Sequence, residues 1–109
     1  MTLRNLPLEE AFDLAEKISC RAGQVSSMGL TAFGSSCDMT LLAFSDGEIV
    51  SEETYAADVL YVVLEGEPTM VLPDKKVSIP AGQMLVVPAG TLHAVEGPGA
   101  FKILQIAVG

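Results

Sequence analysis

One histidine, one glutamate and two tyrosines are the residues of this chain that could do chemistry together. His93 is the only histidine among 109 residues, and Glu53 and Tyr55 lie two positions apart. Residues two apart on a strand share a face, so these three side chains converge if that face is the interior of a barrel. Tyr61 and Gln105 are further candidates, either as inward-facing polar groups or as ordinary wall residues.

Such a set indicates either ligand binding through polar contacts or proton transfer without a metal. Proton transfer needs an acid and a base within hydrogen-bond reach, and histidine titrates near physiological pH. His93 and a partly buried Glu53 would then be the catalytic pair. Each residue also has a structural interpretation: His93 can simply bond a buried neighbour, and Glu52, Glu53 and Asp58 can form a solvated rim.

The element that must position His93 is the stretch from Gly82 to Gly97, GQMLVVPAGTLHAVEG. The apolar run 84–87 precedes the turn Pro88-Ala89-Gly90, and His93 follows at the start of the next segment. Apolar runs bounded by proline and glycine predict strands joined by a tight turn. A histidine placed near the start of the second strand is typical of a barrel wall.

From Ser19 onward the same pattern of short runs and turns continues to the end of the chain. Strands are predicted at 25–31, 38–43, 49–53, 59–65, 68–72, 76–79, 84–87, 93–95 and 101–108, with turns at 34–36, 45–47, 73–75 and 97–99. The run 59–65, VLYVVLE, is apolar on both faces, as a buried strand would be. About nine short strands at regular spacing predict an all-β sandwich or barrel in one domain.

The N-terminal segment has a different pattern. Apolar residues recur from 8 to 18 near the spacing of a helix face, and Pro7, Glu9 and Glu10 suit a first helical turn. We therefore expect a short helix or helical turn over 7–18. An extended segment that docks on a neighbouring sheet is the alternative.

The spacing Gly82-x5-Pro88-x-Gly90-x2-His93 closely resembles the second sequence motif of the cupin family. That motif continues to an asparagine, where this chain has Gly97. The first cupin motif is a pair of histidines and a glutamate between two glycines, and Gly47 and Gly66 match the glycines. Between them, however, the three ligand positions are occupied by Glu53, Tyr55 and Val59.

The resemblance implies a small single-domain cupin of the conserved-barrel type, covering residues 1–109, with its motifs at about 47–66 and 82–97. Its expected fold is a jelly-roll barrel, also called a double-stranded β-helix, with a short N-terminal helical turn. The family's metal-binding motif is degenerate here, because one of four ligand positions keeps its type. We therefore expect no cofactor, and any weak metal would be held by His93 and Glu53.

Composition limits the partners. The net charge is −8 and the six basic residues are scattered, so neither nucleic acid nor an anionic membrane surface is an expected partner. Half of the residues are hydrophobic, with a mean hydropathy of +0.44, which indicates a subunit interface and a homodimer. The N-terminal segment and the run 101–108 are candidates to pair across it.

Two isolated cysteines and no signal-peptide pattern predict reduced thiols in the cytoplasm.

The sequence predicts a ligand-binding barrel as the leading function. Glu53, Tyr55, Tyr61 and His93 would supply polar contacts to a compact, partly apolar small molecule, without an intact metal site. The first alternative is a metal-free acid–base enzyme of the isomerase or epimerase kind that uses Glu53 and His93. The second is a structural or regulatory dimer whose barrel has lost its chemistry.

Overall fold

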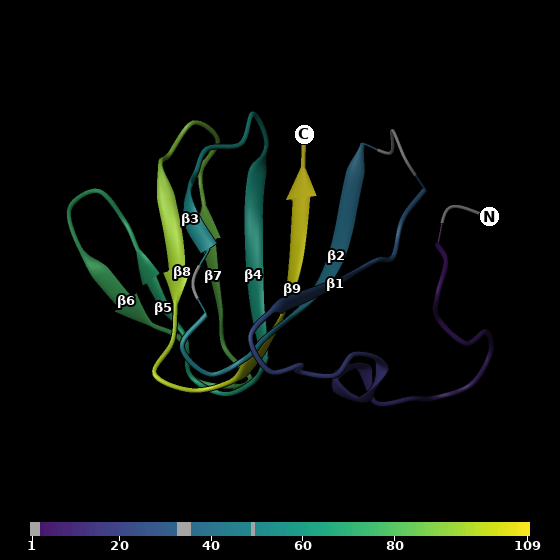
Figure 1. The fold of residues 1–109 in the computed structure, drawn as a ribbon. Helices are drawn as coiled ribbons and strands as arrows, with labels where there is room; N and C mark the ends of the chain where they lie inside the picture. The colour runs from purple at the N-terminus through teal and green to yellow at the C-terminus, as the bar shows by residue number, and fades with distance from the viewer. Residues whose placement is uncertain (1–2, 33–35, 49) are drawn as a thin grey trace.

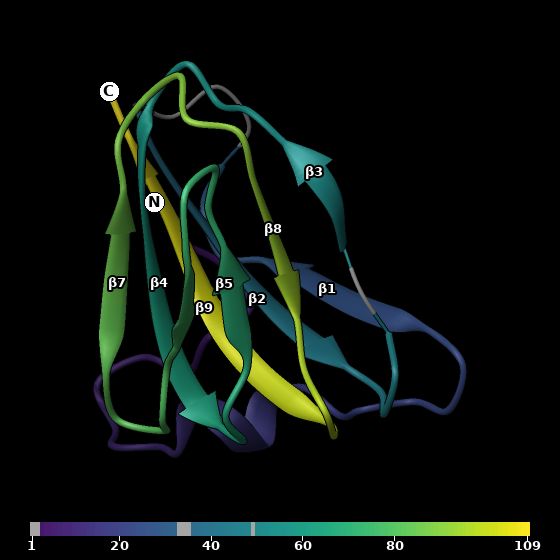
Figure 2. The ribbon, with the colours of Figure 1, turned by 90° about the vertical axis from the view of Figure 1, so that its left-hand side faces the viewer.

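Two antiparallel β-sheets face each other in the computed structural model of this chain (Figure 1), which describes residues 3–32, 36–48 and 50–109. The strands in these residues are β1 (Val25–Gly29), β2 (Cys37–Phe44), β3 (Val50–Glu53), β4 (Asp58–Glu65), β5 (Thr69–Val71), β6 (Lys76–Ser78), β7 (Met84–Val87), β8 (His93–Glu96) and β9 (Phe101–Val108). The larger sheet has the order β1-β2-β9-β4-β7 and the smaller β3-β8-β5-β6 (Figure 2). The predicted all-β barrel is thus confirmed.

Each predicted strand overlaps one observed strand. The bounds of β7 and β9 are those predicted, and the other strands differ from prediction by one or two residues at an end. Residues 34 and 35 of the predicted turn at 34–36, and Ile49 of the predicted strand 49–53, lie outside the described residues. Local alternation and turn residues therefore predict most of the strand positions.

The N-terminal segment forms less helix than the apolar spacing predicts. Its helical turn is confirmed, but in the described residues it is a single 3-10 turn, η1 (Leu14–Lys17). Glu9 adopts a positive φ of 59°, which no helix accommodates, and Ile18 returns to extended backbone. The described part of the chain therefore has no helix long and apolar enough to span a membrane.

The main core lies between the two sheets. On β4, Val59, Tyr61 and Val63 point inward and are buried. The rings of Phe44 and Phe101, which are paired between β2 and β9, stack with their centroids 4.3 Å apart. Both sheets contribute residues to this cluster, so the burial of apolar side chains holds the two sheets together.

A second apolar cluster lies on the outer face of the larger sheet. The N-terminal segment lays Leu6, Leu14 and Ile18 against the outward residues of β2 and β9, including Leu41 and Leu104. The apolar spacing that suggested a helix thus arises from an extended chain with one helical turn docked on a sheet. This was the alternative left open by the sequence.

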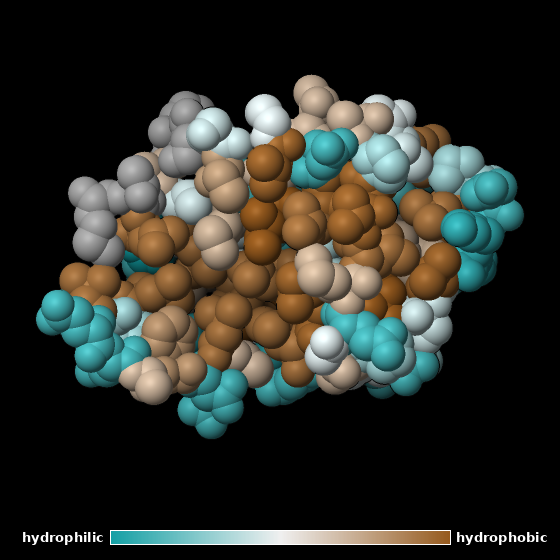
Figure 3. Space-filling model, turned by 180° about the vertical axis from the view of Figure 1, so that it is seen from behind, coloured by the Kyte–Doolittle hydropathy of each residue, from teal (hydrophilic) through white to brown (hydrophobic). Residues whose placement is uncertain are grey.

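The outer face continues apolar beyond this cover, and it becomes exposed toward β7 (Figure 3). Two rows cross the sheet from β2 through β9 and β4 to β7, and their members are Met39, Ile106, Leu60 and Val86 in one row and Leu41, Leu104, Val62 and Met84 in the other. At the β7 end, Met84 and Val86 are 50% and 56% exposed. An antiparallel sheet with one solvated face normally alternates apolar and polar residues, so this outer apolar face is unusual.

The glycine that closes the first motif generates a stability prediction. Gly66 has a φ of 82°, and a Cβ there would lie 2.6 Å from the Ala100 carbonyl oxygen and 2.7 Å from the Phe101 Cβ. Gly47 has the same φ, but a Cβ there would meet nothing within 4 Å. We expect Gly66→Ala to lower the free energy of unfolding by about 2–4 kcal/mol, and the control Gly47→Ala by only about 1–2 kcal/mol.

Urea denaturation of both variants measures this difference. Because the two glycines share a backbone angle, the difference isolates the steric clash with β9. Equal losses for the two variants would show that the close approach of Gly66 to Phe101 does not constrain the barrel.

Candidate functional site

A tight turn places His93 inside the barrel. The turn that precedes β8 is closed by the Thr91 N–H, which donates to the Pro88 carbonyl over 3.2 Å. Gly90, with a φ of 81°, donates its N–H to the Tyr55 carbonyl at 2.9 Å. This bond ties the second motif to the chain that follows β3, and His93 enters the interior with 3% of its surface exposed.

Both ring nitrogens of His93 have protein partners. Nδ1 lies 2.8 Å from the Thr91 carbonyl oxygen, and Nε2 lies 2.7 Å from the Tyr61 hydroxyl. A carbonyl only accepts, so Nδ1 must donate, and in the neutral ring Nε2 then accepts from Tyr61. Burial, followed by the nearby Tyr55 and Glu53, raises the pKa of Tyr61 and keeps this hydroxyl a donor. The imidazole is therefore fixed in one tautomer.

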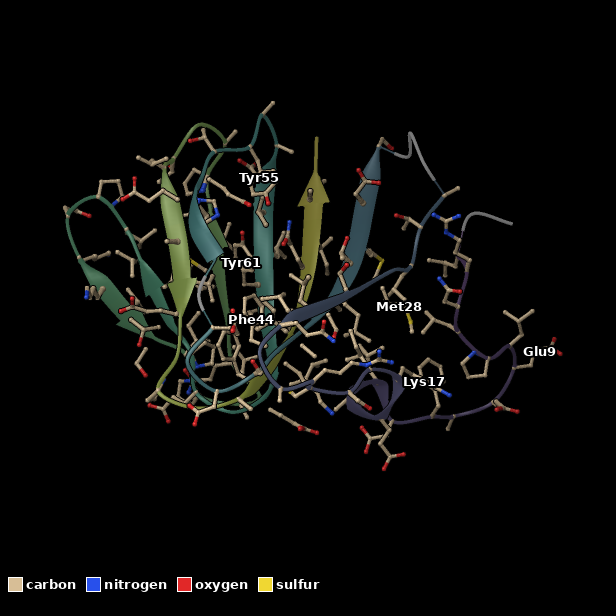
Figure 4. All side chains as sticks on the ribbon, in the orientation of Figure 1. Glu9, Lys17, Met28, Phe44, Tyr55 and Tyr61 are labelled. Atoms are coloured by element: carbon tan, nitrogen blue, oxygen red, sulfur yellow. The ribbon has the colours of Figure 1, made fainter. Side chains whose placement is uncertain are left out.

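Tyr55 connects this buried pair to the surface. Its ring lies 5.8 Å from the His93 ring, centroid to centroid, and its hydroxyl donates to the Glu53 carboxylate. Burial raises the pKa of Tyr55, the bond to Glu53 adds to the rise, and a hydrogen bond with Gln105 opposes it. Tyr55 is half-buried and lies closer than Tyr61 to the end of the barrel where β9 ends (Figure 4).

The structure thus brings Glu53, Tyr55, Tyr61 and His93 together, but at different depths. His93 stands opposite Glu53 in the register of β8 and β3. Of the two interpretations of Glu53, the solvated rim agrees with its exposed side chain, and partial burial is wrong. The Tyr61 hydroxyl and the Thr91 carbonyl occupy both nitrogens of His93, so the more accessible polar groups of the cluster are those of Tyr55 and Glu53.

A cavity of about 360 Å³ adjoins this cluster at Tyr55. We call it the Arg4–Tyr55 cavity, and its lining is Arg4, Gly29, Thr31, Asp38, Met39, Thr40, Tyr55, Gln105 and Ala107. Thr40 and Gln105 are paired between β2 and β9, beside the Gln105–Tyr61 pair of β9 and β4. A smaller cavity of about 60 Å³ has His93, Leu92 and Glu52 in its wall.

Sequence reasoning missed part of this lining. Arg4 stood out only as a scattered basic residue, and Asp38 and Thr40 lay in a strand that carried no motif. Their alternation with Met39 on β2 was the available signal, because it puts Asp38 and Thr40 on the inner face with Gln105. Nothing in the sequence indicated that residue 4 reaches the same place.

The four positions where the resemblance places metal ligands do not fit a transition metal. Val59 is buried in the apolar core, and Tyr55 keeps its proton on a hydroxyl already bonded to Glu53. His93 has no lone pair free for a metal while Tyr61 donates to it. Within the described ranges, no three His, Cys, Asp or Glu side chains form a group that could hold a metal ion.

The two cysteines lie away from this cluster. Both are free thiols: Cys20 is half-buried, with its sulfur 3.9 Å from the Phe101 carbonyl oxygen, and Cys37 is exposed at the start of β2. Neither residue lines the Arg4–Tyr55 cavity.

Comparison with solved structures identifies the fold family. The chain is 42% identical to a cupin superfamily protein of Desulfitobacterium hafniense, with 99% of this chain and 98% of that chain covered and a TM-score of 0.94. It is 33% identical to a cupin 2 conserved barrel domain protein of Leptotrichia buccalis, covering 90% of this chain and 47% of that one, with a TM-score of 0.84. A conserved protein of unknown function from Streptococcus pyogenes shares 21% identity and a TM-score of 0.93, over 99% and 94% of the two chains.

No protein-family model and no curated protein sequence matches the chain. The full-length similarity to the Desulfitobacterium protein, at 42% identity, agrees with the two glycine-framed motifs, the facing antiparallel sheets and the histidine at the start of β8. The chain belongs to the cupin superfamily.

Proposed function

We propose that this cupin barrel binds a small molecule in the Arg4–Tyr55 cavity. The observation that carries the proposal is the position of Tyr55, which lines the cavity and also bonds Glu53 at the accessible end of the polar cluster. A cavity of about 360 Å³ with a few convergent polar groups has the size and character of a small-molecule site. Tyr55, Gln105 and Glu53 would contact the ligand, with Ala107 against its apolar part.

His93 and Tyr61 have a supporting role in this proposal. They stand behind Tyr55 and fix its ring position through the 5.8 Å contact with the imidazole. The acid–base alternative, with His93 and Glu53 as catalytic pair, has less support. Each nitrogen of His93 already has a partner, so proton transfer to a substrate would first require Tyr61 or Thr91 to be displaced.

Binding would take place without a metal ion. The argument is the donor set: one exposed carboxylate at Glu53, one protonated phenol at Tyr55 and an imidazole with both nitrogens occupied. First-row divalent metals need several imidazole, thiolate or carboxylate donors together.

The outer apolar face supports a homodimer as the working form of the protein. Four strands at ~4.8 Å spacing, over about six residues, make a face on the order of 400 Å² in projection, of which the N-terminal segment already covers the part at Leu41 and Leu104. A stable interface needs ~800 Å² from each partner, so the N-terminal segment that packs on the same face would contribute the rest. A second copy suits this surface because its two rows carry no charge, while the chain as a whole has a net charge of −8.

Two tyrosine variants test the binding proposal. In a thermal-shift screen of polar metabolites, a stabilising compound should appear, and Tyr55→Phe should weaken its binding roughly tenfold, because a hydroxyl facing the ligand is lost. Tyr55→Phe should lower the free energy of unfolding by less than about 1 kcal/mol, since the hydroxyl and its partner are accessible.

Tyr61→Phe is the comparison variant for stability, because it leaves the buried Nε2 of His93 without a partner. We expect it to lower the free energy of unfolding by about 1–3 kcal/mol. A broad screen without a hit, or a hit that Tyr55→Phe binds as well as the wild type, would contradict the proposal.

Elemental analysis tests the metal-free site. Untagged protein should contain far less than one equivalent of Fe, Ni, Mn or Zn, because His93 and Glu53 alone are too few donors to retain an ion through purification. Near-stoichiometric metal that disappears in both His93→Ala and Glu53→Ala would show that these residues form a metal centre after all.

Light scattering tests the homodimer. The wild-type protein should have about twice the chain mass of 11.4 kDa at micromolar concentration. Val86→Glu places a charge on the outer apolar face and should shift the mass to that of one chain. Leu92→Glu is the control, because Leu92 is also exposed, at 46%, but borders the small cavity instead. A monomeric wild type, or equal behaviour of the two variants, would count against this interface.

A further inference from the structure

We propose that Arg4 makes the Arg4–Tyr55 cavity a site for a small carboxylate that also bears a hydroxyl or ammonium group. This inference rests on the proposed function, because it names the ligand class of the same site. Arg4 lies outside both cupin motifs and far from the cluster in sequence. Its role follows from how the N-terminal segment is attached.

Three consecutive residues tie the N-terminal segment to the end of β1. The Arg4 N–H donates to the Leu30 carbonyl at 2.9 Å, and the Asn5 side-chain amide donates to the Gly29 carbonyl at 2.7 Å. Leu3 forms an antiparallel bridge with Thr31. The backbone of Arg4 is therefore anchored beside the cavity. On binding an anion, only the side chain of Arg4 would have to become ordered.

The Arg4 guanidinium lies against the end of β1. A Cβ built on Gly29 would be 3.8 Å from Nη2 of Arg4, so the head group packs over a residue that has no side chain. Gly29 lines the cavity together with Arg4. The charged end of Arg4 is thus at the cavity wall, although the residue as a whole is exposed.

Arg4 has no acidic partner among the described residues. The ion pairs there are Lys76–Glu96 and Lys102–Glu65. The chain has 14 acidic and 6 basic residues. A shortage of acidic side chains therefore does not explain why the Arg4 guanidinium pairs with none of them in the described part of the chain. Its planar fork of donors matches a carboxylate in two-point geometry, which makes an anionic ligand group the natural partner.

The rest of the wall supplies acceptors and neutral polar groups. Thr40, Tyr55 and Gln105 line it, and Asp38 accepts a hydrogen bond from the Thr31 hydroxyl at 3.3 Å. A ligand that contacts both Arg4 and Asp38 needs a negative group for the guanidinium and a donor for the carboxylate. Inorganic phosphate, with up to two negative charges near neutral pH, would be repelled by Asp38 more strongly than a carboxylate. The cavity of about 360 Å³ limits the ligand to a small molecule.

Calorimetric titration at low salt tests this assignment. The probes are lactate and serine, the neutral amide lactamide, and inorganic phosphate. Lactate or serine should bind the wild type, and lactamide and phosphate should bind at least tenfold more weakly. Arg4→Gln should weaken the carboxylate at least tenfold, whereas Arg21→Gln, which removes the same charge outside this cavity, should leave it unchanged.

Equal carboxylate affinity in wild type and Arg4→Gln, or lactamide binding as tight as lactate, would overturn the inference. Tighter binding of phosphate than of lactate would also overturn it. If lactate and serine fail to bind while the metabolite screen yields a Tyr55-dependent ligand of another class, the carboxylate assignment falls and the proposed function stands. If no Tyr55-dependent ligand of any class is found, both fall.

Discussion

The two hydrogen bonds of His93 are the constraint on which the interior arrangement depends. Through them one imidazole connects Tyr61, on the larger sheet, to Thr91, in the turn that leads into the smaller sheet. A buried polar ring is stable only when its donors and acceptors are matched, so the tautomer, the ring orientation and the spacing of β4 and β8 are determined together. Tyr55 then packs at a position that this ring defines.

This arrangement alters which polar groups the cupin frame leaves accessible. Where the family frame would hold a metal, Val59 joins the apolar core, and the remaining histidine serves as a hydrogen-bonding support. The accessible polar groups consequently lie further out, at Tyr55, Glu53 and Gln105. Under the proposed function, recognition would use hydrogen bonds and charge rather than coordination.

Local sequence signals predicted the barrel because strand alternation and turn residues act over few positions: the run 84–87 is β7 as observed. The same signals overestimated the N-terminal helix, because apolar residues spaced for docking on a sheet imitate a helix face, as Leu14 and Ile18 do. The convergence of Glu53, Tyr55 and His93 could be inferred from the family frame. The approach of Arg4 could not, since it depends on a backbone bond to Leu30, far along the chain, that no local pattern encodes.

The N-terminal segment connects the two surfaces of the larger sheet. Its residues Leu6 and Leu14 pack on the outer face, whereas Arg4, a few positions earlier, reaches the cavity next to the inner polar cluster. Strand β4 is apolar on both faces, so both faces must be covered. The N-terminal segment covers only part of the outer face. A second copy that covered the rest would press the segment onto the sheet and reduce its freedom. Association through the outer face and order at Arg4 would then stabilise each other, so in such a dimer the cavity and the interface would be coupled through this one segment.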